Sequence, residues 1–175
     1  MRISSASAKF RFIVAGEVLV LSAAIPLLRS APAIASTSTL TAVADSFTKS
    51  DAPSEVNGSS TLLRVDGSPV WNGYVKFNVP AGAIQTAKLR LTAASTTASV
   101  TSVKTSSSSW NEATLNYSNA PSPGATVGTI ASVTSGMVSE VDVTSAVTSN
   151  STVSFAITTA SGTARNFNSR EAATG

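Results

Sequence analysis

The chain has 175 residues, of which 12% are charged, with a formal net charge of +3 and neither cysteine nor histidine. The lack of cysteine excludes a disulfide scaffold and a thiolate metal site, and the lack of histidine removes the commonest metal ligand and general base. So few charges indicate a surface made mostly of serine, threonine, asparagine and glycine.

The first 35 residues are predicted to be a secretory signal peptide. A basic start is followed by the apolar run VLVLSAAIPLL and by small residues at 33–35, after which we expect cleavage. A membrane anchor is the alternative, but the apolar run is shorter than the ~20 residues that a spanning helix needs. We therefore expect residues 36–175 to be secreted and extracellular, with no membrane span once the leader is removed.

The leader accounts for the basic character of the whole chain. It holds four of the twelve basic residues and one of the nine acidic residues, so residues 36–175 carry eight of each. A neutral domain without a basic cluster does not indicate binding to nucleic acid. Its length fits one domain with a sizeable core.

After residue 36 the pattern is that of an all-β domain. Short runs of alternating apolar residues recur about every dozen residues between turn-forming residues, which predicts an antiparallel sandwich or barrel. Because side chains alternate between the two faces of a strand, one face should pack on the core and the other should meet water. Strands are expected at residues 43–48, 60–65, 73–79, 87–92, 98–104, 126–133, 138–143, 153–158 and 166–170.

The segment SSSSWNEATLNYSNAPSPG, residues 106–124, is long for a loop. Within it, residues 109–112 have the pattern of a capping box, which predicts a short helical turn.

The charges on the expected strands suggest a binding face. Alternation places Arg64, Lys76 and Arg90 outward at mid-strand, and it places Tyr74 beside Lys76. If these strands share a sheet, the cations form one patch. The simplest interpretation is a solvated face whose charges discourage edge pairing. The more specific one is a binding face for an anionic polysaccharide, since Arg and Lys bind carboxylate or sulfate and an aromatic ring supports a sugar.

Acidic residues offer two weaker candidates. Glu140 and Asp142 lie two apart on one strand, roughly 6–7 Å, which overlaps the range for glycosidase pairs. Alternation makes both exposed, without the apolar surroundings that raise a pKa, so we expect no enzyme. Asp45, Asp51 and Glu55 could hold a structural Ca²⁺, although EF-hand spacing is absent, and no other metal or cofactor is expected.

The order of motifs resembles a known family. The stretches ADSFTKSDAPSEVNGSSTLLRV, YVKFNVPAGAIQTAKLRL, SSSWNEATLNYSNAP, VDVTSAV and FNSRE resemble the DNRLRE-type domain of secreted bacterial proteins, which is similar to carbohydrate-binding module family 96. The resemblance covers about residues 44–172. It implies a jelly-roll β-sandwich that binds acidic polysaccharides such as alginate, without catalysis. The alternative function is a structural domain of a bacterial cell-surface or matrix protein with no soluble ligand.

The resemblance also implies particular residues. The basic positions of the family match Arg64, Lys76, Arg90 and Arg170, and its other motifs match Asn57-Gly58 and Trp110 with Glu112, which look structural. A further strand normally follows the last motif, so we expect the sandwich to lack its last strand and to leave a sheet edge unpaired. We expect a monomer, and an origin within a larger secreted enzyme or surface protein would explain the short end.

Overall fold

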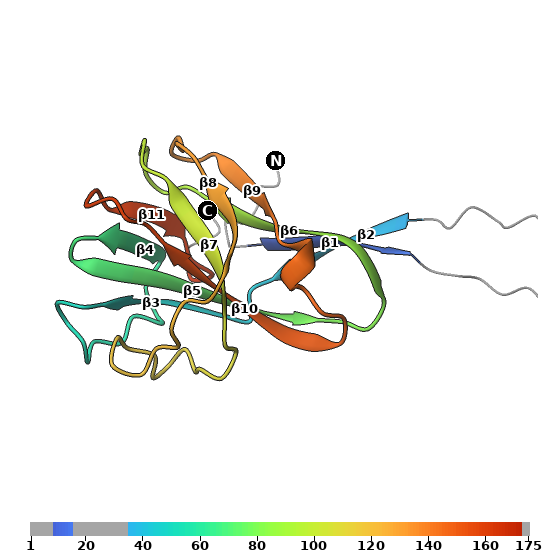
Figure 1. Ribbon diagram of the computed structural model, residues 1–175, viewed down its shortest axis with the longest axis horizontal. Helices are drawn as coiled ribbons and strands as arrows, with labels where there is room; N and C mark the ends of the chain where they lie inside the picture. The colour runs from blue at the N-terminus through green and yellow to red at the C-terminus, as the bar shows by residue number, and fades with distance from the viewer. Residues whose placement is uncertain (1–8, 16–34, 173–175) are drawn as a thin grey trace, which may run out of the picture.

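The structure is a computed structural model that describes residues 9–15 and 35–172 (Figure 1). Most of the predicted leader, residues 1–8 and 16–34, lies outside the described residues, so the leader and its cleavage stay predictions. Within the described part of the chain, no helix is long and apolar enough to cross a membrane.

Two antiparallel sheets pack face to face across one core (Figure 1). The antiparallel β-sandwich that the alternation predicts is therefore confirmed, whereas its jelly-roll connectivity stays a prediction. The smaller sheet has the strand order β2-β1-β6-β9, with β1 (Lys9–Ala15), β2 (Ala35–Thr41), β6 (Ala83–Thr92) and β9 (Val138–Asp142). The larger sheet has the order β11-β4-β5-β10-β7-β8, and β3 also pairs with β5. Its strands are β3 (Ala44–Lys49), β4 (Leu62–Gly67), β5 (Val70–Val79), β7 (Thr101–Ser106), β8 (Thr126–Ile130), β10 (Ser151–Thr158) and β11 (Arg165–Asn168), and a 3-10 turn η1 (Thr144–Ala146) follows β9.

The core consists of the apolar side chains that alternation places inward. Each such side chain contributes roughly 1.5–3 kcal/mol on burial, so the row of inward residues on each strand fixes which face turns to the core. The apolar residues that alternate along the expected strands are buried: Leu63 and Val65, Val75, Phe77 and Val79, Leu89 and Leu91, Val141 and Val143, and Val153, Phe155 and Ile157.

Strands β1 and β2 are the elements that the sequence pattern did not predict. Residues 9–15, from the expected leader, form an antiparallel pair with β6 on one side and with β2 on the other. Strand β6 therefore has strand neighbours on both sides among the described residues. The missing last strand and the unpaired edge that it implies stay predictions.

The connection from β5 to β6 decides where the predicted cations lie. Pro80 cannot continue the ladder, and Gly82 has a φ of 144° that residues with a side chain rarely adopt. The chain crosses here from the larger sheet to the smaller one. Consecutive strands with the same alternation therefore present their outward residues on opposite sides of the sandwich.

Candidate functional site

The long segment of residues 106–124 folds over the outer face of the larger sheet and closes a second, smaller core. Figure 1 shows this segment, in yellow, on the side of β3 and β5. The rings of Tyr74 and Trp110 meet edge to face with centroids 6.1 Å apart. The Trp110 indole N–H donates to Ser154 Oγ at 2.8 Å, and the Tyr74 hydroxyl donates to the Pro121 carbonyl at 2.9 Å. The buried members of this second core are Ala44, Tyr74, Trp110, Leu115 and Ala156.

The loop buries Tyr74, which is 1% exposed. Burial disfavours the phenolate and raises the pKa of Tyr74 to about 12. The prediction that Tyr74 lies on a solvent-facing surface is therefore wrong. Alternation gives the correct side of the strand, but it does not reveal that a distant loop covers that side.

Lys76 lies under the same loop and supports it. Its ammonium donates to the Trp110 carbonyl oxygen and lies 4.2 Å from the centroid of the Trp110 ring, a cation–π contact. Burial of the ammonium lowers the pKa of Lys76, and the nearby Glu112 carboxylate partly opposes this shift. Lys76 therefore already has a structural partner.

Arg90 does not lie with the other predicted cations. It belongs to β6 in the smaller sheet, and its Nε lies 3.0 Å from the Glu140 carboxylate on β9. Lys88, on the same face of β6, lies 3.4 Å from the same carboxylate. A single patch of Arg64, Lys76 and Arg90 is therefore wrong, because the crossing after β5 separates Arg90 from the other two.

Arg170 is the most heavily bonded of the predicted binding residues. Its Nη2 lies 2.6 Å from a Glu112 carboxylate oxygen and 2.9 Å from Glu171 Oε1, and its Nη1 donates to the Val43 carbonyl at 2.9 Å. The Glu112 and Glu171 carboxylates favour the charged guanidinium, and the pKa of Arg170 is raised although desolvation opposes this. The guanidinium thus joins the C-terminal segment to residues 106–124 and to the chain before β3.

The motif residues around Arg170 satisfy the free side of β3, whose one strand partner among the described residues is β5. Glu112 Oε1 accepts the backbone N–H of Asp45 at 2.7 Å, and Asn57 Nδ2 donates to the Phe47 carbonyl at 3.2 Å. An unpaired edge would otherwise be open to another strand. The geometry agrees with the structural role expected for Asn57 and Glu112.

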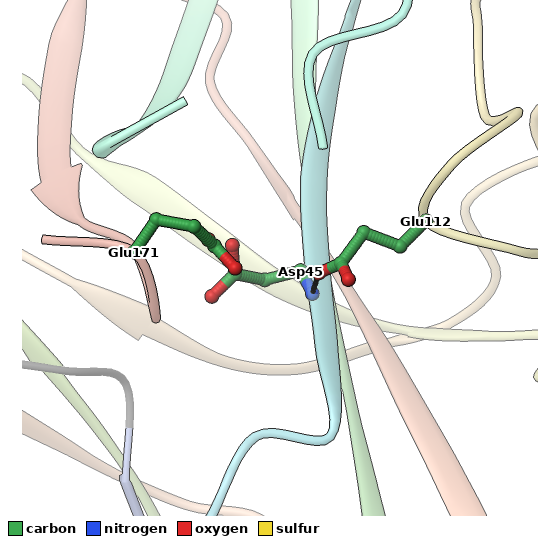
Figure 2. Close-up of side chains that lie close together, drawn as sticks. All are labelled: Asp45, Glu112 and Glu171. Atoms are coloured by element: carbon green, nitrogen blue, oxygen red, sulfur yellow. Dashed lines mark hydrogen bonds between the residues drawn. The ribbon is translucent and has the colours of Figure 1, made fainter. Parts of the chain in front are cut away.

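Three carboxylates meet at this place (Figure 2). Asp45, Glu112 and Glu171 each offer an oxygen within 4.8 Å of the others, and Asp45 is 1% exposed. Burial is the largest cause that raises the pKa of Asp45 to about 7, and the two neighbouring carboxylates act in the same direction. The backbone N–H of Arg170, 2.7 Å from Asp45 Oδ2, opposes them.

These are the oxygen ligands that Ca²⁺ prefers, so this cluster is the place where a cation would fit best. The set differs from the expected one. Asp51 instead accepts the Trp71 indole N–H at 2.7 Å, and Glu55 lies 2.7 Å from the Lys49 ammonium. In the cluster itself, the Arg170 guanidinium supplies positive charge to two of the three carboxylates. The structural Ca²⁺ and the expectation of no other metal or cofactor stay predictions.

The carboxylates considered for catalysis lie on the exposed face of β9. Glu140 is held by Lys88 and Arg90, while Asp142 accepts the backbone N–H of Thr144 at 2.9 Å. That hydrogen bond lowers the pKa of Asp142, which is the opposite of what a general acid at neutral pH requires.

Arg64 differs from the other predicted cations in its surroundings. Among the residues that the structure describes, its half-buried guanidinium forms no hydrogen bond or ion pair, and its central carbon lies 6.0 Å from the centroid of the Phe47 ring. Lys104, opposite Ala156 in the outward row of the larger sheet, also has no hydrogen-bond or ion-pair partner among the described residues. The alternation of Val103 and Lys104 could have identified this second cation, which the sequence analysis did not single out.

A polar pocket beside Trp110 is lined by side chains that already hold the loop together. Asn111 Oδ1 accepts the backbone N–H of Ala113 at 2.9 Å, and Asn119 Nδ2 donates to the Thr114 carbonyl at 2.9 Å. These amides are therefore not free to contact a sugar without loosening the loop. The lining residues are Ser109, Trp110, Asn111, Thr114, Leu115 and Asn119.

The chain is thus an antiparallel β-sandwich with a loop that covers the outer face of its larger sheet. A family model described as carbohydrate-binding module family 96 matches residues 36–175, and the chain belongs to that family. The resemblance seen in the sequence motifs is thereby confirmed. A search of curated proteins gives no match to the chain.

Proposed function

We propose that residues 36–175 form a secreted, non-catalytic module that binds an acidic polysaccharide of the polyuronate type. Membership of a carbohydrate-binding family supports binding of a glycan. The start of the family match at residue 36, directly after the expected cleavage position, supports secretion. The acidic character of the glycan is our inference from the cations.

The observation that carries the proposal is the unpaired state of Arg64. A guanidinium presents a planar fork that matches a carboxylate with two parallel hydrogen bonds. Among the described residues Arg64 has no acidic partner, whereas Arg90 is paired with Glu140 and Arg170 with two carboxylates. A uronate carboxylate would therefore bind at Arg64 without breaking an existing ion pair.

The other predicted contacts then fall into two groups. Lys76 and Tyr74 act by holding the loop of residues 106–124 in place, so their loss changes binding through the shape of the surface. Arg90 and Arg170 would reach a glycan only after exchanging a protein carboxylate for a glycan carboxylate. Lys104 joins Arg64 as a second cation of the larger sheet that has no acidic partner among the described residues.

The test is affinity electrophoresis in native gels that contain alginate, a neutral glucan or no polymer. Alginate should retard the wild-type protein and the neutral glucan should not, and retardation should fall steeply with salt because exposed charges are screened within ~8 Å at physiological ionic strength. Arg64→Ala should weaken binding about tenfold or more, since hydrogen bonds to charged groups contribute roughly 1.5–3 kcal/mol. Lys88→Ala is the matched control, because Lys88 is an exposed cation on the opposite sheet.

The main alternative is a structural domain with no soluble ligand. Such a domain would be retarded by neither polymer. Retention that is unchanged in Arg64→Ala but lost in Arg90→Ala would instead place the binding face on the smaller sheet.

A further inference from the structure

Two asparagines of this chain are followed directly by glycine, and the fold treats the two pairs differently. Asn57-Gly58 lies between β3 and β4, outside the strands, whereas Asn72-Gly73 lies within β5. Asparagine is thermolabile, because the main-chain nitrogen of the next residue can attack the carbon of its side-chain amide. A glycine in the next position has no Cβ to hinder that attack. The surroundings of each pair should therefore decide which one reacts.

The pair in β5 is held inside a sheet. Gly73 stands opposite Phe47 of β3 on one side and opposite Ile157 of β10 on the other. In a strand with partners on both sides, each backbone N–H is directed at one of them and donates to it. Attack by the Gly73 nitrogen would require β5 to leave its partners, and core strands open only at a free-energy cost that approaches that of global unfolding. The fold therefore protects Asn72.

The nitrogen of the other glycine has no such restraint. Among the residues that the structure describes, the backbone N–H of Gly58 forms no hydrogen bond. Gly58 also lines a pocket of about 280 Å³, and the next residue, Ser59, is exposed. The attacking nitrogen is thus unbonded, and water reaches the place where a later hydrolysis would need it.

Asn57 and Gly58 also support the free side of β3. Asn57 Nδ2 donates to the Phe47 carbonyl at 3.2 Å, two residues along the strand from Asp45, whose backbone N–H donates to Glu112. Gly58 packs closely on the backbone of Glu112, since a Cβ added to it would lie 2.4 Å from the Glu112 carbonyl oxygen. A chemical change at this pair would therefore disturb both the carbonyl of Phe47 and the position of Glu112.

We propose that Asn57-Gly58 is a site of spontaneous deamidation, and that the modification loosens the free side of β3. The Gly58 nitrogen bonds to the side-chain carbon of Asn57, and the amide nitrogen leaves as ammonia together with the proton of the Gly58 N–H. Water then opens the succinimide ring that results. Attack of water at the side-chain carbon gives aspartate, and attack at the main-chain carbon gives isoaspartate, in which the chain runs through the side chain.

Both products remove a donor and add a negative charge. A carboxylate cannot donate to the Phe47 carbonyl, so this carbonyl loses its side-chain partner. Isoaspartate also lengthens the main chain by a methylene group directly before Gly58, where the Glu112 backbone leaves no room for an added atom. The modified domain should therefore hold Glu112 less firmly than the unmodified domain.

Trypsin separates the two pairs, because it cuts after Lys49, Arg64 and Lys76. It releases residues 50–64 and 65–76 as two peptides with one asparagine each. The full chain is incubated at mildly alkaline pH, either folded or in guanidinium chloride, and is then digested at mildly acidic pH. Mass spectrometry measures how much of each peptide has exchanged its amide for an acid. In the folded chain, residues 50–64 should convert at least about tenfold faster than residues 65–76, because opening of β5 limits the second reaction. In guanidinium chloride the two rates should be similar.

The matched control is Asn57→Gln, since glutamine would have to close a larger ring and should leave residues 50–64 unconverted. Equal conversion of the two peptides, in a chain that circular dichroism shows to be folded, would overturn the proposal. Conversion of residues 50–64 in guanidinium chloride but not in the folded chain would overturn it as well.

A second measurement tests the structural consequence. The variant Asn57→Asp carries one product of the reaction and should melt roughly 3–10 °C below the wild type, as expected when a carbonyl loses its donor. Wild-type protein that has been incubated until residues 50–64 are converted should show a loss in the same direction. If both proteins melt at the temperature of fresh wild type, the modification does not loosen β3 and that part of the proposal is wrong.

Discussion

The buried carboxyl of Asp45 should make the stability of this domain depend on pH in an unusual direction. Its pKa rises from an ordinary 3.8 to about 7 in the folded protein, chiefly because burial penalises the charged form. Between these two values the folded state holds a proton that the unfolded state has released. The contribution of Asp45 to stability is therefore complete below about pH 4, decreases as the pH rises towards 7, and is lost above it.

The size of the effect follows from the shift. Each pKa unit corresponds to 1.36 kcal/mol, so a shift of about three units gives a ceiling of about 4 kcal/mol. For a domain of this length that is roughly 10–15 °C in melting temperature. The coupling to Glu112 and Glu171, whose carboxylate oxygens lie within 4.8 Å, spreads the effect over the cluster but does not change its sign.

Thermal unfolding of wild type and Asp45→Asn between pH 5 and pH 8 isolates the group, because other titrating residues are common to both proteins. The melting temperature of Asp45→Asn should rise relative to that of the wild type as the pH rises, since the amide remains neutral and can still accept the backbone N–H of Arg170. If the melting temperature of the wild type rises relative to that of the variant between pH 5 and 8, the reasoning is refuted. If added Ca²⁺ stabilises the wild type at pH 8 and not the variant, the carboxylates hold a cation and the calcium prediction is supported.

Three further substitutions test the packing. Trp110→Ala should cost about 3–5 kcal/mol in urea unfolding, because it removes the anchor of the second core, whereas Trp110→Phe should cost less and lose mainly the bond to Ser154. Gly58→Ala should destabilise by about 1–3 kcal/mol, since an added Cβ would lie 2.4 Å from the Glu112 carbonyl oxygen, while Gly162→Ala, with 3.7 Å of room, should be nearly neutral. Arg165 is completely buried, and its guanidinium donates to a backbone carbonyl. Arg165→Met should therefore cost less than about 1.5 kcal/mol of stability, whereas Arg165→Ala should leave a costly cavity. Equal losses of stability in the two variants would mean that the charge matters more than the volume.

Alternation predicted the core well because it depends on one local rule. Phe77 and Leu89 are buried as expected, since consecutive residues on a strand must face opposite ways. The same rule could not say which sheet a strand joins. The crossing at Pro80 and Gly82 has the composition of an ordinary turn, and it moves Arg90 to the other side of the sandwich.

The covering loop was the other feature beyond the reach of a local pattern. Its composition, rich in serine and asparagine, is that of a solvated segment, yet two of its apolar residues, Trp110 and Leu115, are buried against the sheet. Tyr74 is correctly outward on β5, yet it is buried because residues 36 positions further along the chain lie over it. Long-range contact of this kind leaves no periodic signal in either segment.

These two failures have a common consequence for how the positive charges of the family motifs should be understood. A lysine or arginine at an outward position can serve a ligand only if the fold leaves it without an internal partner. Lys76 is bonded to the Trp110 carbonyl and Arg170 to Glu112, so in these two places the basic motif residue holds a loop or a chain end in position. Arg64 has the same sequence signature and no such partner among the described residues. The contribution of a motif cation to binding should therefore depend on whether protein carboxylates and carbonyls already bond to it. Removal of a cation without such partners, as Arg64 is among the described residues, should change the affinity for the glycan without changing the stability of the fold.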